Sequence, residues 1–159
     1  MAWTYPRVAV VPTNARPCFF DAAAALLPQV DHLVVVQNGG DLITPADDKT
    51  VVVLDPRKPL NISRWWNQGL EWARRYAIER GAQFWDVAVV NDDVIVSPDW
   101  FDKLSETLHR TNVAVVSFGS VTMPVLHSKQ GPMDLMSRPQ GFAWMTAGQT
   151  GIRADEDLV

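Results

Sequence analysis

The chain has 159 residues, a formal net charge of −4 and a hydrophobic fraction of 47%, which together predict one folded domain with a single core. Its 14 Lys and Arg residues are scattered along the sequence, and this distribution argues against a nucleic-acid-binding surface. One cysteine excludes an internal disulfide, no apolar run reaches the ~20 residues of a membrane span, and the N-terminus lacks a signal-peptide pattern, so we expect a cytoplasmic protein.

The first part of the chain alternates short apolar strands with a helix. Residues 7–13 form a valine-rich run that predicts a strand buried on both faces. Pro17 suits the first position of a helix, the alanines that follow favour helix, and Pro28 ends it. Two more strands are predicted over 32–41 and 50–56, so the order begins strand, helix, strand, strand.

The longest helical pattern follows. Asn61 can cap this helix, apolar residues then recur at helical spacing, and Gly81 marks its end. Three further elements are predicted: a strand over 85–90, a helix that Ser97 and Pro98 begin and that runs to about Arg110, and a strand over 112–121.

Buried strands that alternate with amphipathic helices predict an α/β fold, with a mostly parallel central sheet flanked by helices. In such sheets ligands bind beyond the carboxyl ends of the strands. The segments that follow four of the predicted strands are polar and read PTNARP, QNGGD, LDPRKP and NDD. We therefore expect the functional site at this edge of the sheet.

The sharpest of these segments is Asn91-Asp92-Asp93, which stands between two runs rich in valine. Carboxylates at a strand end are hard oxygen ligands of the kind that Mg²⁺ or Mn²⁺ prefers. If the extended backbone continues, Asn91 and Asp93 share a face and Asp92 points across. The alternative is an ordinary turn, in which these side chains bond their own backbone.

Two other strand ends offer candidates for ligand binding. Thr13, Asn14 and Arg16 could face a nucleotide base or a phosphate, or merely connect a strand to a helix. Gly39 and Gly40 could let the backbone approach a ligand that Asn38 or Asp41 binds, although Asn-Gly is also a common turn. Neither segment resembles a phosphate-binding loop of the dinucleotide or P-loop type.

The long helix and the end of the chain contain further candidates. Gly69 inside a helix indicates close packing or close ligand approach, and Asn67 beside it is polar on an apolar face. Residues 140–144 predict a turn and strand with an aromatic side chain available for stacking. The three histidines lack the spacing of a zinc site, and no Ser-His-Asp or Cys-His pattern is present.

Together these segments resemble the nucleotide-sugar-binding part of family 2-type glycosyltransferases of the GT-A fold. The similarity rests on the order of five stretches and covers nearly the whole chain: VAVVPTNARP, LVVVQNGGD, NISRWWNQGLEWA, VAVVNDDVIVSPDWFDKL and GFAWMTAGQTGIRADEDL. The third stretch carries an Asn-x-Gly-x-x-x-Ala pattern at Asn67, Gly69 and Ala73. The fourth carries an Asp-x-Asp-like motif.

The resemblance implies a nucleotide-diphosphate-sugar donor and a divalent ion, Mg²⁺ or Mn²⁺. It assigns Asp93, with Asn91, to the metal and the diphosphate, and Asp92 to the ribose or sugar side. The remaining donor-binding residues that it implies are Thr13, Asn14, Arg16, Asn38, Asp41 and Asn67. Because Asn91 stands where the family has aspartate, we expect weak ion binding in the absence of donor.

The family usually carries its general base, an aspartate, beyond a segment like GIRADEDL, and the base deprotonates the acceptor hydroxyl for inverting transfer. This chain stops at Val159, so we expect a single glycosyltransferase domain truncated at its C-terminus. Asp155, Glu156 and Asp157 are the candidates for the base within the chain, although a frayed acidic end is the alternative.

Three hypotheses follow for function. The first is a metal-assisted, inverting glycosyltransferase whose acceptor is an unknown glycan, lipid, protein or small molecule. The second is a noncatalytic nucleotide-sugar-binding or assembly module that lacks the base, and a homo-oligomer would fit it. The third is a nucleotidyltransferase, which also uses strand-end aspartates with metal but normally carries a basic glycine-rich loop.

Overall fold

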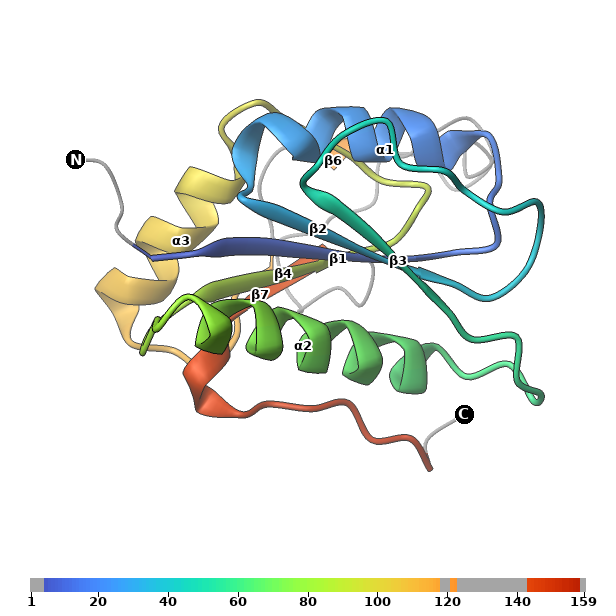
Figure 1. The fold of residues 1–159 in the computed structure, drawn as a ribbon. Coiled ribbons are helices and arrows are strands. Elements are labelled where there is room, and N and C mark those ends of the chain that lie inside the picture. The colour runs from blue at the N-terminus through green and yellow to red at the C-terminus, as the bar shows by residue number, and fades with distance from the viewer. Residues whose placement is uncertain (1–4, 118–120, 123–142, 158–159) are drawn as a thin grey trace.

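The computed structural model describes residues 5–117, 121–122 and 143–157, and Figure 1 shows their arrangement in three layers, with helices on both faces of a central sheet. The elements are, in chain order, β1 (Arg7–Thr13), α1 (Cys18–Leu26), a short 3₁₀ helix (Leu27–Gln29), β2 (His32–Gln37), β3 (Thr50–Leu54), α2 (Ile62–Glu79), β4 (Asp86–Val90), β5 (Ile95–Val96), α3 (Trp100–Thr111), β6 (Val121–Thr122), β7 (Ala143–Ala147) and a second 3₁₀ helix (Gly148–Thr150).

The central sheet has the strand order β3-β2-β1-β4-β7. Strands β1 to β4 are parallel to one another, and β7 pairs antiparallel with β4 at the edge. The mostly parallel α/β fold predicted from the sequence is therefore confirmed. Because β1, β2, β3 and β4 are parallel, their carboxyl ends meet at one edge of the sheet, where the polar segments were predicted to converge.

Alternate residues of each strand face different helical layers, since a strand turns successive side chains to opposite faces. In β1, Ala9 and Val11 belong to a core cluster that includes residues of α1 and α3. Val8 and Val10 belong to a second cluster with α2. All four are fully buried, which explains why β1 is apolar at each of the positions 8–11 rather than at every second one.

Helix α2 begins and ends where the sequence predicts. The Asn61 side chain caps it by accepting a hydrogen bond of 2.9 Å from the backbone N–H of Arg64. Gly81, with φ of +70°, follows its last turn. Gly69 lies against β1: a Cβ atom built there would collide with Cγ1 of Val10. Of the two interpretations of Gly69, close packing is the one that the structure supports.

Two elements differ from their predictions. Helix α3 begins at Trp100 rather than at Pro98, and the Ser97 hydroxyl donates to Asp99 Oδ1 (2.9 Å) instead of capping the helix. The strand predicted over 112–121 is wrong for residues 112–117, where Val116 forms an isolated bridge with Met145 of β7. Val121 and Thr122 form β6, which pairs with β5 in a separate two-stranded sheet, and residues 118–120 lie outside the described residues.

The fifth strand of the main sheet is β7, which overlaps residues 140–144, where a turn and strand with an aromatic available for stacking were predicted. Trp144 is only 8% exposed and packs edge to face against Trp66, with ring centroids 5.9 Å apart. It is therefore a core residue and is not available to stack on a ligand. Residues 140–142 lie outside the described residues. Within the described ranges, no helix has the length and apolar character needed to cross a membrane.

Candidate functional site

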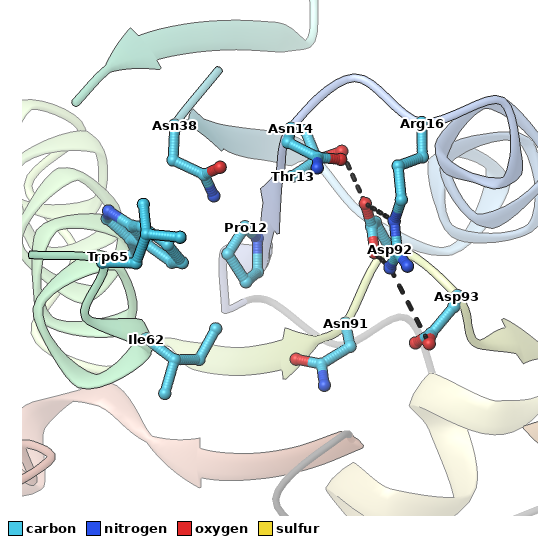
Figure 2. Close-up of a pocket in the computed structure, with 11 residues that line it drawn as sticks. Pro12, Thr13, Asn14, Arg16, Asn38, Ile62, Trp65, Asn91, Asp92 and Asp93 are labelled. Atoms are coloured by element: carbon cyan, nitrogen blue, oxygen red, sulfur yellow. Dashed lines mark hydrogen bonds and ion pairs between the residues drawn. The ribbon is translucent and has the colours of Figure 1, made fainter. Parts of the chain in front are cut away.

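A pocket of about 240 Å³ opens at the carboxyl ends of β1, β2 and β4 (Figure 2). Among the residues predicted to bind donor or metal, all except Asp41 and Asn67 line it. The complete lining is Pro12, Thr13, Asn14, Arg16, Asn38, Leu60, Ile62, Trp65, Asn91, Asp92 and Asp93. Segments that are far apart in the sequence thus converge on one hollow.

The Asn91-Asp92-Asp93 segment forms a turn directly after β4. The backbone N–H of Val94 donates to the carbonyl of Asn91 at 3.2 Å, so the extended alternation does not continue beyond Val90. Asp92 and Asp93 are nevertheless 4% and 8% exposed and both line the pocket. The segment is therefore both a turn and part of the pocket wall, and the carboxylate of Asp92 binds side chains at or just after the end of β1 rather than its own backbone.

Asp92, in the turn after β4, forms hydrogen bonds with the end of β1 and the loop that follows it. Its Oδ2 accepts from the Thr13 hydroxyl at 2.7 Å and from Arg16 Nε at 3.2 Å, and its Oδ1 accepts from Arg16 Nη2. The Thr13 oxygen in turn accepts from the backbone N–H of Ala15 at 3.0 Å. Hydrogen bonds from charged and hydroxyl donors stabilise a buried carboxylate that would otherwise be costly. The bond to Asp92 also raises the pKa of Arg16, so this guanidinium stays charged.

The glycine turn after β2 packs against this loop. Gly40 has φ of +77°, and a Cβ atom built on it would collide with the backbone oxygen of Asn14. A side chain at this position would thus push the two loops apart. The close backbone approach expected at Gly39-Gly40 is to the neighbouring loop, and it places Asn38 on the pocket wall.

Asp93 and Asn91 supply the oxygen atoms that a divalent ion would require. Asp93 Oδ2 lies 3.7 Å from Arg16 Nη2, and Asn91 Oδ1 is buried with no hydrogen-bond partner among the described residues. A buried amide oxygen without a partner is uncommon, and the binding of an ion or a water molecule is one of its accepted explanations. The described residues hold no cluster of three or more His, Cys, Asp or Glu side chains able to bind a metal. The donor set therefore fits an ion that also binds substrate phosphates.

The opposite wall of the pocket is apolar. Figure 2 shows Trp65 and Ile62 on the far side of the hollow from Asp92 and Arg16. Trp65 is 7% exposed, so it belongs both to the core and to the pocket. The sequence analysis missed Ile62 as a pocket residue. The cap at Asn61 could have indicated it, because the cap makes Ile62 the first residue of α2 and places it near the polar strand ends.

Asp55 organises the loop that leads from β3 to this apolar wall. Asp55 is only 2% exposed. Its carboxylate accepts hydrogen bonds from Arg57 Nε at 2.6 Å and from Arg64 Nε at 3.0 Å. Arg64 also donates to the carbonyl of Pro59 at 3.2 Å. Hydrogen bonds from Arg57 lower the pKa of Asp55 well below its ordinary value, and those from Arg64 add to this effect against the opposing effect of burial.

This pKa shift predicts a pH dependence of stability. Because the folded-state pKa lies below the unfolded value of about 3.9, Asp55 stabilises the fold fully above that value, and the contribution is lost as the pH falls below it. Asp55→Asn is expected to lower the free energy of unfolding by about 2 kcal/mol at pH 7. Urea unfolding at pH 7, 5, 4 and 3 should show the difference from wild type shrinking at the acidic end. The matched control is Asp21→Asn on the exposed side of α1, and a gap that stays constant with pH contradicts the role assigned to Asp55.

Asp41 and Asn67 lie outside the pocket lining. Asp41 is exposed, and its backbone carbonyl accepts a hydrogen bond from Gln37 Nε2 at 2.7 Å. The Asn67 amide binds the end of the chain: Nδ2 donates to the Ala154 carbonyl and to Glu156 Oε1, both at 2.9 Å. Oδ1 accepts from the Ala154 N–H at 2.8 Å. A role of these two residues in donor binding stays a prediction.

None of the three candidates for the catalytic base, Asp155, Glu156 and Asp157, lines the pocket. They belong to a segment that lies beside the start of α2. The backbone oxygen of Glu156 accepts from Asn61 Nδ2 at 2.9 Å, and Asp155 Oδ1 accepts from the Asp157 N–H at 2.9 Å. In Figure 1 this last segment follows the outer side of α2. Hydrogen bonds from Asn61, the N-cap of α2, and from Asn67 within it thus hold Ala154 and Glu156 against this helix.

Comparison with known proteins supports the fold. The structure of S. aureus TarS residues 1–349, from a glycosyltransferase, superposes with a TM-score of 0.60 at 13% sequence identity. The superposition covers 96% of this chain and 51% of the TarS chain, so the chain spans about half the length of that structure. No family model matches the sequence, and no curated protein matches it. The chain therefore has a glycosyltransferase-like fold, with a sequence far removed from that of its structural neighbour.

Proposed function

We propose that this chain is a glycosyltransferase domain that binds a nucleotide-diphosphate sugar together with Mg²⁺ or Mn²⁺. The observation that carries the proposal is the pocket itself. It joins two carboxylates, a guanidinium and a buried amide oxygen on one wall to an apolar wall opposite, at the strand-end edge of a glycosyltransferase-like fold. A nucleotide sugar has matching halves, an anionic diphosphate and a flat nucleoside.

The net charge of the polar wall supports the requirement for a metal ion. Asp92, Asp93 and Arg16 together carry a formal charge of −1, which disfavours a diphosphate anion on its own. A divalent ion held by Asp93 and the Asn91 amide oxygen would reverse this sign. When bound, the ion would neutralise the charge that builds on the diphosphate leaving group. The chain's own contribution would be these two side chains, which come from the turn directly after β4 and line the same pocket.

The apolar wall would take the nucleoside. Trp65, Ile62 and Leu60 line this side, where removal of apolar surface from water favours a flat ring. Asn38 lies close by, and its side-chain amide can donate and accept hydrogen bonds. The Thr13 hydroxyl donates its hydrogen bond to Asp92, so we assign Thr13 to positioning that carboxylate rather than to contact with the nucleotide base.

Transfer to an acceptor requires a base in addition to donor binding. Asp155, Glu156 and Asp157 remain the candidates within the chain, and inverting displacement is the outcome that the family resemblance implies. The alternative proposal is a noncatalytic nucleotide-sugar-binding or assembly module, which is favoured by the position of this acidic run outside the pocket lining. The acceptor class, a cytoplasmic location and self-association belong to the same set of proposals.

Calorimetric titration tests the proposal. UDP-, GDP- and dTDP-sugars should be titrated with and without Mn²⁺, and we expect at least one to bind with Mn²⁺ and to bind markedly more weakly without it. Absence of binding for all three, or binding that is indifferent to Mn²⁺, overturns the proposal. Donor hydrolysis or transfer in the same samples separates the two forms of the proposal, since the noncatalytic module binds donor without turnover.

A further inference from the structure

Arg16 places a positive charge where a metal ion would otherwise be most strongly attracted. Its guanidinium forms a two-point contact with Asp92, through Nε to Oδ2 and Nη2 to Oδ1, and Nη2 lies 3.7 Å from Asp93 Oδ2. The carboxylates are 6% and 11% exposed and the Arg16 side chain 41%. The cation is thus set between two nearly buried acids and is itself open to the pocket.

A second aspartate–arginine pair at the same edge of the sheet can be compared with Arg16 and Asp92. Asp55 also holds an arginine by two points, Arg57, but Arg57 does not line the pocket. Arg16 is therefore the arginine whose charge acts on the proposed metal ligands. Since Arg is charged at every accessible pH, this effect is permanent in the absence of a ligand.

We propose that Arg16 suppresses metal binding in the donor-free protein, so that the divalent ion binds stably only together with a nucleotide diphosphate. This inference rests on the proposed function. With Arg16 in place the acidic pair presents a net charge of −1 rather than −2 to an incoming ion. A diphosphate restores the missing negative charge, and it also gives the guanidinium an anionic partner of matching geometry.

Coupling of this kind is reciprocal. If the nucleotide strengthens Mn²⁺ binding by some factor, Mn²⁺ strengthens nucleotide binding by the same factor. Arg16 enlarges that factor because it weakens the binding of Mn²⁺ alone while favouring the ternary state. The chain would consequently hold little metal at rest, and it would recruit the ion at the moment when the donor enters.

The test measures Mn²⁺ affinity without nucleotide, by the electron paramagnetic resonance signal of free Mn²⁺, in the full chain. Arg16→Gln removes the charge, and it is expected to bind Mn²⁺ alone about tenfold more tightly than wild type. Arg16→Met keeps the aliphatic stem and serves as the second neutral variant if the first does not fold. Arg16→Lys keeps the charge but loses the two-point contact, and it should stay close to wild type.

Arg57→Gln is the matched control, since it removes an aspartate-bound arginine outside the pocket, and its Mn²⁺ affinity should equal that of wild type. Unchanged or weaker Mn²⁺ binding in both neutral variants, with Mn²⁺-dependent UDP, GDP or dTDP binding intact in wild type, overturns the inference and leaves the proposed function standing. Tenfold tighter Mn²⁺ binding without any nucleotide binding supports the role of Arg16 and overturns the proposed function instead. The two failures are therefore distinguishable.

Discussion

Replacement of Asp93 with alanine is expected to weaken Mn²⁺-dependent nucleotide-sugar binding by about 100-fold, or ~2.7 kcal/mol. Asp93 and Asn91 both line the pocket, and the amide oxygen of Asn91 is buried; hard cations such as Mg²⁺ take only one or two carboxylates from the protein in sites of this kind. Loss of one carboxylate removes a large part of the charge that holds the ion against the diphosphate. Calorimetry of wild type and variant with Mn²⁺ measures this loss directly.

The same variant should behave differently without metal. In EDTA the Asp93 carboxylate only repels the diphosphate, so Asp93→Ala is expected to bind the bare nucleotide at least as well as wild type does. Asp99→Ala is the matched control, because Asp99 lies on the surface at the start of α3, where it pairs with Lys103. Equal weakening of Asp93→Ala with and without Mn²⁺ would indicate damage to the pocket and contradict a metal-binding role.

The second large effect concerns stability. Gly69→Ala is expected to lower the free energy of unfolding by about 3 kcal/mol, although alanine at an exposed helical position would raise it by about 1 kcal/mol over glycine. The added Cβ collides with Val10, which is fully buried in the middle strand of the sheet. Neither α2 nor β1 can move without disturbing its neighbours, because interiors are closely packed. Urea unfolding measures the change.

A double variant identifies the cause. Val10→Ala removes the Cγ atoms that the new methyl group would meet, so Gly69→Ala should cost much less in that background than in wild type. Additive effects of the two substitutions would show that the destabilisation does not come from this contact. A stabilising effect of Gly69→Ala alone would contradict the close packing of α2 on β1.

Much of the fold was predictable because it depends on local signals. Strands β1 to β4 are valine-rich runs bounded by turn residues, and α2 has a capping asparagine, helical periodicity and a terminal glycine. The pocket was also predictable in outline, since parallel strands bring their polar carboxyl ends to one edge. Asn14, Asn38 and Asp93 were placed together by this rule alone, without knowledge of any contact between them.

What the sequence does not reveal are pairings between distant residues. Arg16 and Asp92 lie 76 positions apart, and nothing local indicates that the guanidinium binds this carboxylate. Asn67 has the pattern of a ligand-binding residue but binds Ala154 and Glu156, which are 87 and 89 positions away. A strand at the start of β7 was predicted from residues 140–144, but its place in the main sheet was not, because the antiparallel pairing of β7 with β4 joins segments far apart in the sequence and 112–121 has the stronger β-forming composition.

The most direct test of the metal–diphosphate site is its location. In an NMR experiment on the 17.7 kDa chain, Mn²⁺ is added in trace amounts with UDP, GDP or dTDP, and paramagnetic broadening of the backbone amides is mapped. We expect the amides of Asn14, Asn38 and Asp93 to broaden first, while those of His32 and Asp86 at the opposite ends of β2 and β4 stay sharp. Broadening centred anywhere else on the domain, or none with any of the three nucleotides, would contradict a metal–diphosphate site in this pocket.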